Sequence, residues 1–160
     1  MDLIELNIKR AMDAFEKGEM RVGDTVYCSK ALEDVVLLEV PSRDHIEFYK
    51  KNKYILPKEL RYKKKNGEIA EAPIPCFVKI KTGNYFREHW VGWTENRTEK
   101  EIEEFRNRAD FLEFFSRGHG FRVERIEGDI FILLKIYGDS QDEVNEFVSA
   151  CFYNDAIIWE

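Results

Sequence analysis

The chain has 160 residues, of which 44% are apolar and 14% aromatic, and this suits one globular domain or two small ones that share a core. A disordered chain would be poorer in both classes of side chain. The net charge of −6 and the pI near 5.3 argue against a protein that is coated with DNA or RNA over its whole surface, because nucleic-acid-binding domains usually have a high pI.

The positive charge is concentrated in the middle of the chain. Residues 50–98 carry 12 basic and 5 acidic side chains, whereas residues 1–49 carry 6 and 11, and residues 99–160 carry 7 and 15. We call residues 50–65 the basic segment, because they hold eight Lys or Arg and one acid, Glu59, with Tyr49, Tyr54 and Tyr62 in or beside them. A local field attracts a partner of opposite sign even when the total charge is negative.

The basic segment therefore predicts an anion-binding patch, with nucleic acid or an acidic protein surface as its partner. The patch would consist of Lys50, Lys51, Lys53, Lys58, Arg61, Lys63, Lys64 and Lys65. The alternative is a solvated hairpin whose lysines only keep the protein soluble, since a run of like charges is commonly ordinary surface.

The cysteines and the first residues of the chain indicate a cytoplasmic protein. Residues 1–10 have an acid at position 2 and no continuous apolar region, so they do not form a signal peptide. The most apolar run, residues 130–134, is too short to span a bilayer. An odd number of distant cysteines, Cys28, Cys76 and Cys151, indicates reduced thiols, which we expect to be buried and structural. The use of one Gln alongside many Glu and Lys is typical of thermophile proteins.

The N-terminal half predicts a helix followed by strands and hairpins. We expect a helix over residues 3–17, strands over 21–29 and 35–40, and a short helix from a Ser42 cap to about residue 51. The run from Val22 to Tyr27 is similar to the opening of many small β-barrels.

Two hairpins are predicted next. Strands over residues 60–65 and 68–72 flank Asn66-Gly67, which predicts a two-residue type I′ turn with lysines 63–65 at its tip. A second hairpin is expected from strands over residues 76–81 and 85–93, with a turn at residues 82–84.

The C-terminal half predicts two helices between strands. Thr98 and Glu101 form a capping box for a helix to about residue 117, which Gly118 ends at its C′ position. Strands over residues 121–126 and 130–137, a helix over 140–152 and a strand over 156–159 follow.

The resulting order, β-α-β-β-α-β over about residues 84–159, is that of a ferredoxin-like split βαβ unit. The expected fold class is therefore α+β: this unit in residues 81–160, with the N-terminal helix and hairpin-rich region, residues 1–80, packed on it as one compact domain.

The third strand of this unit is apolar on both alternations, so something should cover the sheet face that the helices leave open. The candidates are the N-terminal half and a second copy of the chain. Of the aromatic string Tyr85, Phe86, Trp90 and Trp93, the pair Phe86 and Trp90 shares one strand face. Aromatic residues on such strands stack on bases in RNA binders, but the RNP signature is absent and burial under the N-terminal half is favoured.

The sequence contains no recognisable catalytic or metal-binding motif. The three histidines have no metal-ligand spacing, and dinucleotide, P-loop and nucleophile-elbow patterns are absent, so we expect no metal and no cofactor. His89, His119 and Arg87 are the candidates for a catalytic group acting on a phosphorylated or nucleotide substrate.

Three functions follow in order of preference. The first is a non-enzymatic binding module that uses the basic segment. The second is a homodimeric interaction or regulatory domain that assembles through its sheet. The third is an enzyme. We expect a membrane role in none of the three cases.

Overall fold

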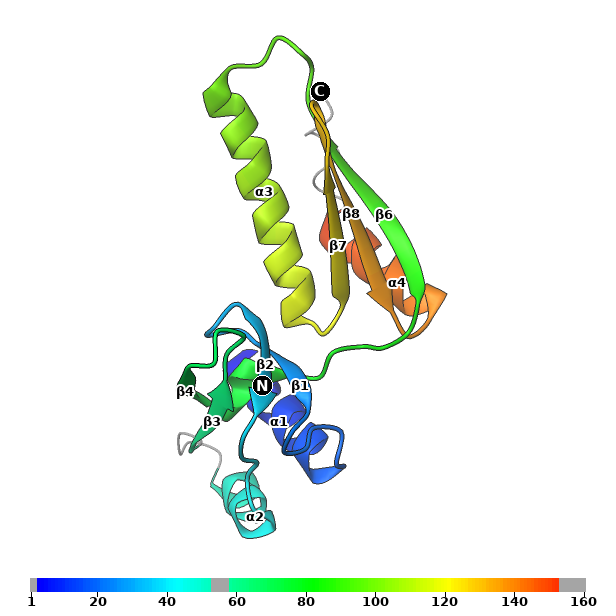
Figure 1. The fold of residues 1–160 in the computed structure, drawn as a ribbon. Coiled ribbons are helices and arrows are strands. Elements are labelled where there is room, and N and C mark those ends of the chain that lie inside the picture. The colour runs from blue at the N-terminus through cyan, green and yellow to red at the C-terminus, as the bar shows by residue number, and fades with distance from the viewer. Residues whose placement is uncertain (1–2, 53–57, 153–160) are drawn as a thin grey trace. The chain divides into compact units, whose positions relative to one another are not determined.

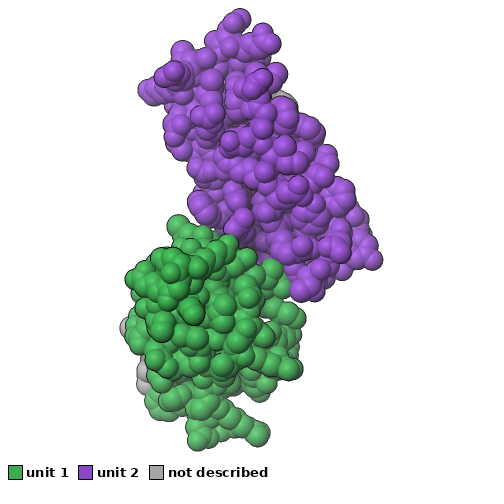
Figure 2. Space-filling model, viewed as in Figure 1, with its two compact units in different colours: residues 1–80 green, residues 81–160 purple. Residues whose placement is uncertain are grey.

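The structure, a computed structural model, describes residues 3–52 and 58–152, with side chains from residue 6 onward. Within these ranges the chain forms four α-helices and two antiparallel sheets, so the α+β class is confirmed (Figure 1). The chain divides into two compact units, residues 1–80 and residues 81–160 (Figure 2). None of the described helices combines the length and the apolar character needed to cross a membrane.

The first unit is a five-stranded sheet with a helix packed against it. Its elements are α1 (Leu3–Glu16), β1 (Thr25–Cys28), β2 (Glu33–Leu37), α2 (Arg43–Lys51), β3 (Glu59–Lys63), β4 (Ile69–Pro73), a 3₁₀ turn (Ile74–Cys76) and β5 (Phe77–Val78). The strand order is β4-β3-β2-β1-β5, all antiparallel. The last strand therefore extends the sheet beyond β1, and β4 and β5 are its two edge strands.

The inner face of this sheet follows the alternation expected of half-buried strands. Val26, Val35, Leu37, Leu60 and Tyr62 point inward and are buried together with one face of α1. That face of α1 is formed by Ala11, Met12 and Phe15, at helical spacing. Residues between them on β3, such as Arg61 and Lys63, consequently point outward.

The predicted hairpin between β3 and β4 is confirmed, but its turn type is different. Gly67 has φ of 87°, whereas Asn66 does not have positive φ, as a type I′ turn would require. The Gly67 amide donates to the Lys64 carbonyl (2.9 Å) and the Lys64 amide to the Glu68 carbonyl (2.8 Å). This is a three-residue loop with the left-handed glycine last. Asn66 favours it because its Oδ1 accepts a hydrogen bond from the Glu68 amide (2.9 Å).

The second predicted hairpin is wrong. β5, which contains Phe77 and Val78, pairs with β1 in the first sheet, whereas β6 (Tyr85–Gly92) belongs to the second. Residues 79–84 are therefore the connection between the two units and not the turn of a hairpin. Local strand propensity located β6, but of the strand predicted over residues 76–81 only Phe77 and Val78 form one. Propensity also carries no information on which strand each one pairs with.

The second unit is a three-stranded sheet with two helices. Its elements are β6, α3 (Glu99–Gly118), β7 (Arg122–Glu127), β8 (Phe131–Gly138) and α4 (Gln141–Phe152). The strand order is β6-β8-β7, so β8 is central and antiparallel to both neighbours. The last predicted strand, residues 156–159, lies outside the described residues.

Both helices of this unit cover the same face of the sheet. Ile132, Leu134 and Ile136 of β8 share one core with Leu112 of α3 and Val144 of α4. These three positions are two residues apart, so they lie on one face of the strand. The other face, with Phe131, Leu133, Lys135 and Tyr137, carries no helix.

The ends of α3 are set by local hydrogen bonds. The capping box is confirmed, because the Glu101 amide donates to Thr98 Oγ1 (3.2 Å) and the Thr98 amide to Glu101 Oε1 (3.3 Å). The C′ residue is Gly120 with φ of 87°, and not Gly118 as predicted. The Phe121 amide donates to the Ser116 carbonyl and the Gly120 amide to that of Arg117, which is a Schellman motif.

Substitutions at Gly83 and Gly118 test how closely the backbone at Gly83 packs against that at Gly138. A Cβ at Gly83 would lie 2.4 Å from the Gly138 carbonyl oxygen, whereas a Cβ at Gly118 meets nothing within 4 Å. We expect Gly83→Ala to lower the free energy of unfolding of the second unit by about 1–3 kcal/mol, and Gly118→Ala to raise it by up to about 1 kcal/mol. Urea unfolding followed by tryptophan fluorescence reports on this unit, because all three tryptophans lie in residues 81–160. Equal effects of the two substitutions would contradict the close approach at Gly83.

Candidate functional site

The structure separates the predicted patch into two groups of cations. Lys50 and Lys51 end α2, and the Lys58 amide donates to the Tyr49 hydroxyl of the same helix. The second group is formed by Arg61 and Lys63 on β3 and by Lys64 and Lys65 in the turn that follows. Lys53 lies outside the described residues.

The two ends of β3 carry cations that lie far apart. At about 3.3 Å per residue, the five steps from Lys58 to Lys63 span roughly 17 Å. This is about twice the distance over which physiological salt screens exposed charges. The cations of the basic segment are therefore spread along the length of β3 and do not form one compact patch.

The cations differ in how far acidic side chains neutralise them. Lys50 pairs with Glu16, and this hydrogen bond raises the pKa of Lys50. Lys64 lies 3.9 Å from Glu68. Within residues 3–52 and 58–152, no carboxylate lies within salt-bridge distance of Arg61, Lys63 or Lys65, but two carboxylates accept hydrogen bonds from backbone amides of these residues.

Two such backbone contacts hold the strand and the turn in place. The Arg61 amide donates to Glu39 Oε1 (2.8 Å), and the Lys65 amide donates to Glu33 Oε1 (3.1 Å). Arg61, Lys63 and Lys65, which we call the hairpin cations, have exposed side chains. Lys51 and Lys58 of the first group are exposed as well, but the hairpin cations lie together on one strand and its turn.

A cleft of about 470 Å³ lies beside Lys50, between α1 and α2. Phe15, Pro41 and Ile46 contribute its apolar lining. Its charged lining consists of two ion pairs, Lys50 with Glu16 and Arg43 with Glu47 (3.7 Å). Because each cation there already faces a carboxylate, the cleft offers no net charge to an anionic ligand.

Arg87 and His89, two of the candidate catalytic residues, are packed against a helix. Both lie on the helix-covered face of β6. Arg87 Nη1 donates to Ser149 Oγ (3.0 Å) and to the Asn145 carbonyl (3.4 Å) of α4. The His89 ring packs edge-on against Phe152 at 4.8 Å. Alternation predicted that the two share a face, but it could not say which face the helices cover.

His119 is part of an aromatic cluster. It is the C-cap residue of α3, and its ring lies 4.7 Å from that of Phe115 and 5.4 Å from that of Phe147. His119 contacts Phe147 of α4, whereas His89 contacts Phe152 of the same helix. The structure does not bring His119, His89 and Arg87 together into a catalytic arrangement.

The cysteines and acids of the described residues form no metal site. Among these residues, no group of three or more His, Cys, Asp or Glu side chains is arranged to hold a metal ion. Cys28 is fully buried, as expected, whereas Cys76 and Cys151 are only half-buried. Burial raises the pKa of the Cys28 thiol, so its reactive thiolate form is less populated than that of an ordinary cysteine.

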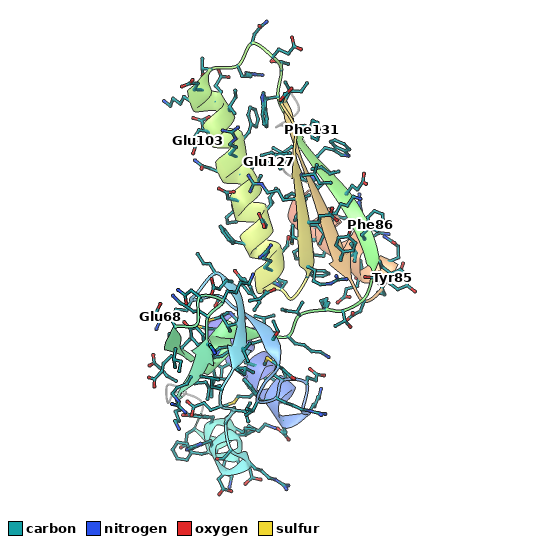
Figure 3. All side chains as sticks on the ribbon, viewed as in Figure 1. Glu68, Tyr85, Phe86, Glu103, Glu127 and Phe131 are labelled. Atoms are coloured by element: carbon teal, nitrogen blue, oxygen red, sulfur yellow. The ribbon has the colours of Figure 1, made fainter. Side chains whose placement is uncertain are left out.

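The helices of the second unit leave one face of its sheet uncovered. Phe86 and Trp90 lie on that face and are 43% and 41% exposed. The expected burial of this face under residues 1–80 stays a prediction. Phe131 of β8, labelled in Figure 3, is another aromatic side chain of this face. Tyr137 of the same strand shares this face, because it lies six residues further on. Trp93, by contrast, is buried and stacks on Phe105 of α3 at 5.7 Å. In the sequence, the signal for this face was that the strand β8 is apolar at both sets of alternate positions.

Comparison with protein-family models, with curated proteins and with solved structures gives no match to this chain.

Replacing His119 tests whether its role is structural. We expect His119→Ala to lower the free energy of unfolding by about 1 kcal/mol, because two aromatic contacts are lost. His45→Ala is the control, since His45 is exposed on α2 and its loss should cost less than about 0.5 kcal/mol. Thermal unfolding followed by far-UV circular dichroism measures both. An unchanged stability of His119→Ala would show that its ring contacts do not hold the fold.

Thiol labelling tests the burial of Cys28. With Ellman's reagent at about pH 8, near the ordinary pKa of cysteine, we expect the native protein to react through Cys76 and Cys151 and to leave Cys28 unmodified until denaturant is added. Cys28→Ser should then leave the fast, native reaction unchanged and remove one thiol from the denatured count. A loss of native labelling in this variant would contradict the assignment.

Proposed function

We propose that this chain is a non-enzymatic binding module that holds an acidic protein surface against the hairpin cations. The observation that carries the proposal is the exposure of Arg61, Lys63 and Lys65 on one strand and its turn, without a neutralising carboxylate among the described residues. Two amide-to-carboxylate bonds and a three-residue turn support this strand end, so the charges are presented from ordered backbone.

The surroundings of the hairpin cations favour a protein over a nucleic acid. On the outer face of the hairpin, Arg61 is paired across the strands with Glu71, and Lys63 with Ile69, which is 58% exposed. Glu59 lies on the same face, two residues before Arg61. A phosphate backbone carries a negative charge at every nucleotide, so it could not keep its charges away from these acids, and it would gain nothing from an exposed isoleucine. An acidic protein surface can place carboxylates against the hairpin cations and other side chains against Glu59, Glu71 and Ile69. A protein surface can meet both charge signs and an apolar side chain.

The charge of the first unit fits this more limited role. Residues 1–80 carry 15 basic and 14 acidic side chains, so the unit as a whole is nearly neutral. Attraction by the hairpin cations is therefore local and short in range. We expect an interaction of modest affinity that weakens as salt is added.

The same proposal includes the finer points of architecture and location. The second unit is a ferredoxin-like split βαβ unit, which the order β6-β8-β7 with both helices on one face supports. The protein works in the cytoplasm, as the odd number of cysteines indicates.

Charge reversal tests the hairpin cations. We expect the triple variant Arg61→Glu, Lys63→Glu, Lys65→Glu to weaken binding of fluorescent poly-L-glutamate at least about tenfold at roughly 50 mM salt, because all attraction at this surface becomes repulsion. Fluorescence anisotropy measures the affinity. The matched control is Lys9→Glu, Lys17→Glu, Lys79→Glu, which changes the net charge equally at exposed positions of the same unit.

Three results would overturn the proposal. The first is that the wild-type protein does not bind poly-L-glutamate. The second is that the control variant loses as much affinity as the triple variant. The third is tighter binding of a single-stranded or double-stranded oligonucleotide than of poly-L-glutamate, with a steep salt dependence, which would identify nucleic acid as the partner.

A further inference from the structure

The face of the second sheet that α3 and α4 leave uncovered is rich in aromatic and aliphatic side chains. We call it the open sheet face. It is formed by alternate residues of all three strands: Phe86, Glu88 and Trp90 of β6, Phe131, Leu133, Lys135 and Tyr137 of β8, and Arg122, Glu124 and Ile126 of β7. Six of these ten side chains are aromatic or aliphatic.

One end of the open sheet face is a continuous apolar surface. Trp90, Leu133 and Ile126 stand side by side across the three strands. Leu133 is only 6% exposed, whereas Trp90 and Ile126, which flank it, are 41% and 39% exposed. The Trp90 ring also contacts that of Phe131 at 5.2 Å. Contiguous exposed apolar side chains on a sheet mark an interaction surface more often than isolated ones do.

The middle of the open sheet face carries charges of both signs. Lys135 stands between Glu88 and Glu124, with 4.0 Å between its Nζ and the Glu88 carboxylate. The Tyr137 hydroxyl donates to Glu124 Oε2 (2.8 Å), and Arg122 lies over the Tyr137 ring at 5.2 Å. The face therefore holds two cations and two carboxylates, although residues 81–160 carry 10 basic and 17 acidic side chains.

The balance of charges on the open sheet face favours a second copy of the chain over a nucleic acid. Stacking of nucleic-acid bases on Phe86 and Trp90 would need an excess of positive charge along the backbone path, and Glu88 and Glu124 cancel it here. A twofold axis, by contrast, places the same face against itself, so a surface must carry both signs to be complementary to its own copy. Lys135 of one copy can then face Glu88 or Glu124 of the other, while the apolar ends are removed from water.

We infer that the open sheet face is a homodimer interface, in which two copies of the chain pack sheet against sheet. The layers would lie about 10 Å apart with interleaved aromatic side chains, as in other face-to-face sheet packings. This surface belongs to the second unit, and the inference does not depend on the hairpin cations.

The size of the face sets the expected strength. β8 has eight residues, and three strands of this length cover roughly 26 Å by 14 Å, or about 370 Å² in projection. A stable interface buries about 800 Å² of accessible surface on each partner. Side-chain relief enlarges the projected value but leaves a small interface, so the dissociation constant should be micromolar or weaker.

Sedimentation velocity on the full chain tests the interface. Between about 5 and 500 µM we expect the wild-type protein to shift from monomer to dimer, and to keep the dimer in about 0.5 M salt, because the contact is mainly apolar. Trp90→Glu should weaken the dimer at least about tenfold, because it places a charge in the apolar end of the interface. Phe111→Glu is the matched control: Phe111 is 56% exposed in the same unit, but on α3.

Each other outcome decides against the inference. A monomer at every concentration, a dimer that Trp90→Glu leaves intact, or a dimer that Phe111→Glu weakens equally would overturn it. A dimer lost in high salt would point to charge attraction elsewhere. Quenching of a monomeric protein's tryptophan fluorescence by oligothymidylate would assign the face to nucleic acid instead. Far-UV circular dichroism establishes that the variants fold, and Phe86→Glu replaces Trp90→Glu if the latter does not.

Discussion

The structure of the second unit depends on one constraint: its central strand is apolar on both faces, but both helices lie on one of them. On the covered face, Ile132, Leu134 and Ile136 anchor α3 and α4 in a common core. The helices can approach closely because small residues stand where strand and helix meet. A Cβ at Gly138 would lie 2.7 Å from Val144 of α4 and 3.0 Å from Phe121. Neither α3 nor α4 lies on the opposite face, which carries Phe131 and Leu133 of the same strand.

The same constraint explains why the polar groups of β6 are not available for chemistry. The strand alternates, so each of its residues faces either the helices or the open side. Arg87 and His89 face the helices, and α4 supplies the hydroxyl, the carbonyl and the ring that surround them. Burying a cation or an imidazole requires such partners. The groups that looked most like a catalytic pair are therefore explained by the docking of α4 on the sheet.

Features that depend on neighbouring residues were predictable from the sequence, and those that depend on pairing were not. The Ser42 cap and the Thr98–Glu101 capping box were predicted because each lies within four residues and has a single geometry. The Asn66-Gly67 hairpin was predicted, but not its turn type, because one left-handed glycine is compatible with two loop lengths. The pairing of β5 with β1 could not be predicted, because it joins residues about 50 positions apart along the chain.

The two candidate surfaces could also be predicted only in part from the sequence. The basic segment was located by composition alone, but the alternation of β3 divides it: Leu60 and Tyr62 turn inward, and only the residues between them reach solvent. The aromatic pair Phe86 and Trp90 was identified, yet its exposure depends on which face of the sheet the helices take. Composition locates charge and aromatic content along the chain, whereas the fold decides which of these side chains share a surface.

The two surfaces would also reinforce one another. A dimer formed through the open sheet face carries two sets of hairpin cations, one from each copy, whatever the orientation of the units within a chain. An acidic partner that presents two sites would then be bound by both sets, and the second contact becomes intramolecular. Such avidity gives useful binding from weak contacts, which suits a nearly neutral first unit and a small sheet interface. It also makes the affinity for an extended acidic partner depend on protein concentration, through the fraction of the chain that is dimeric.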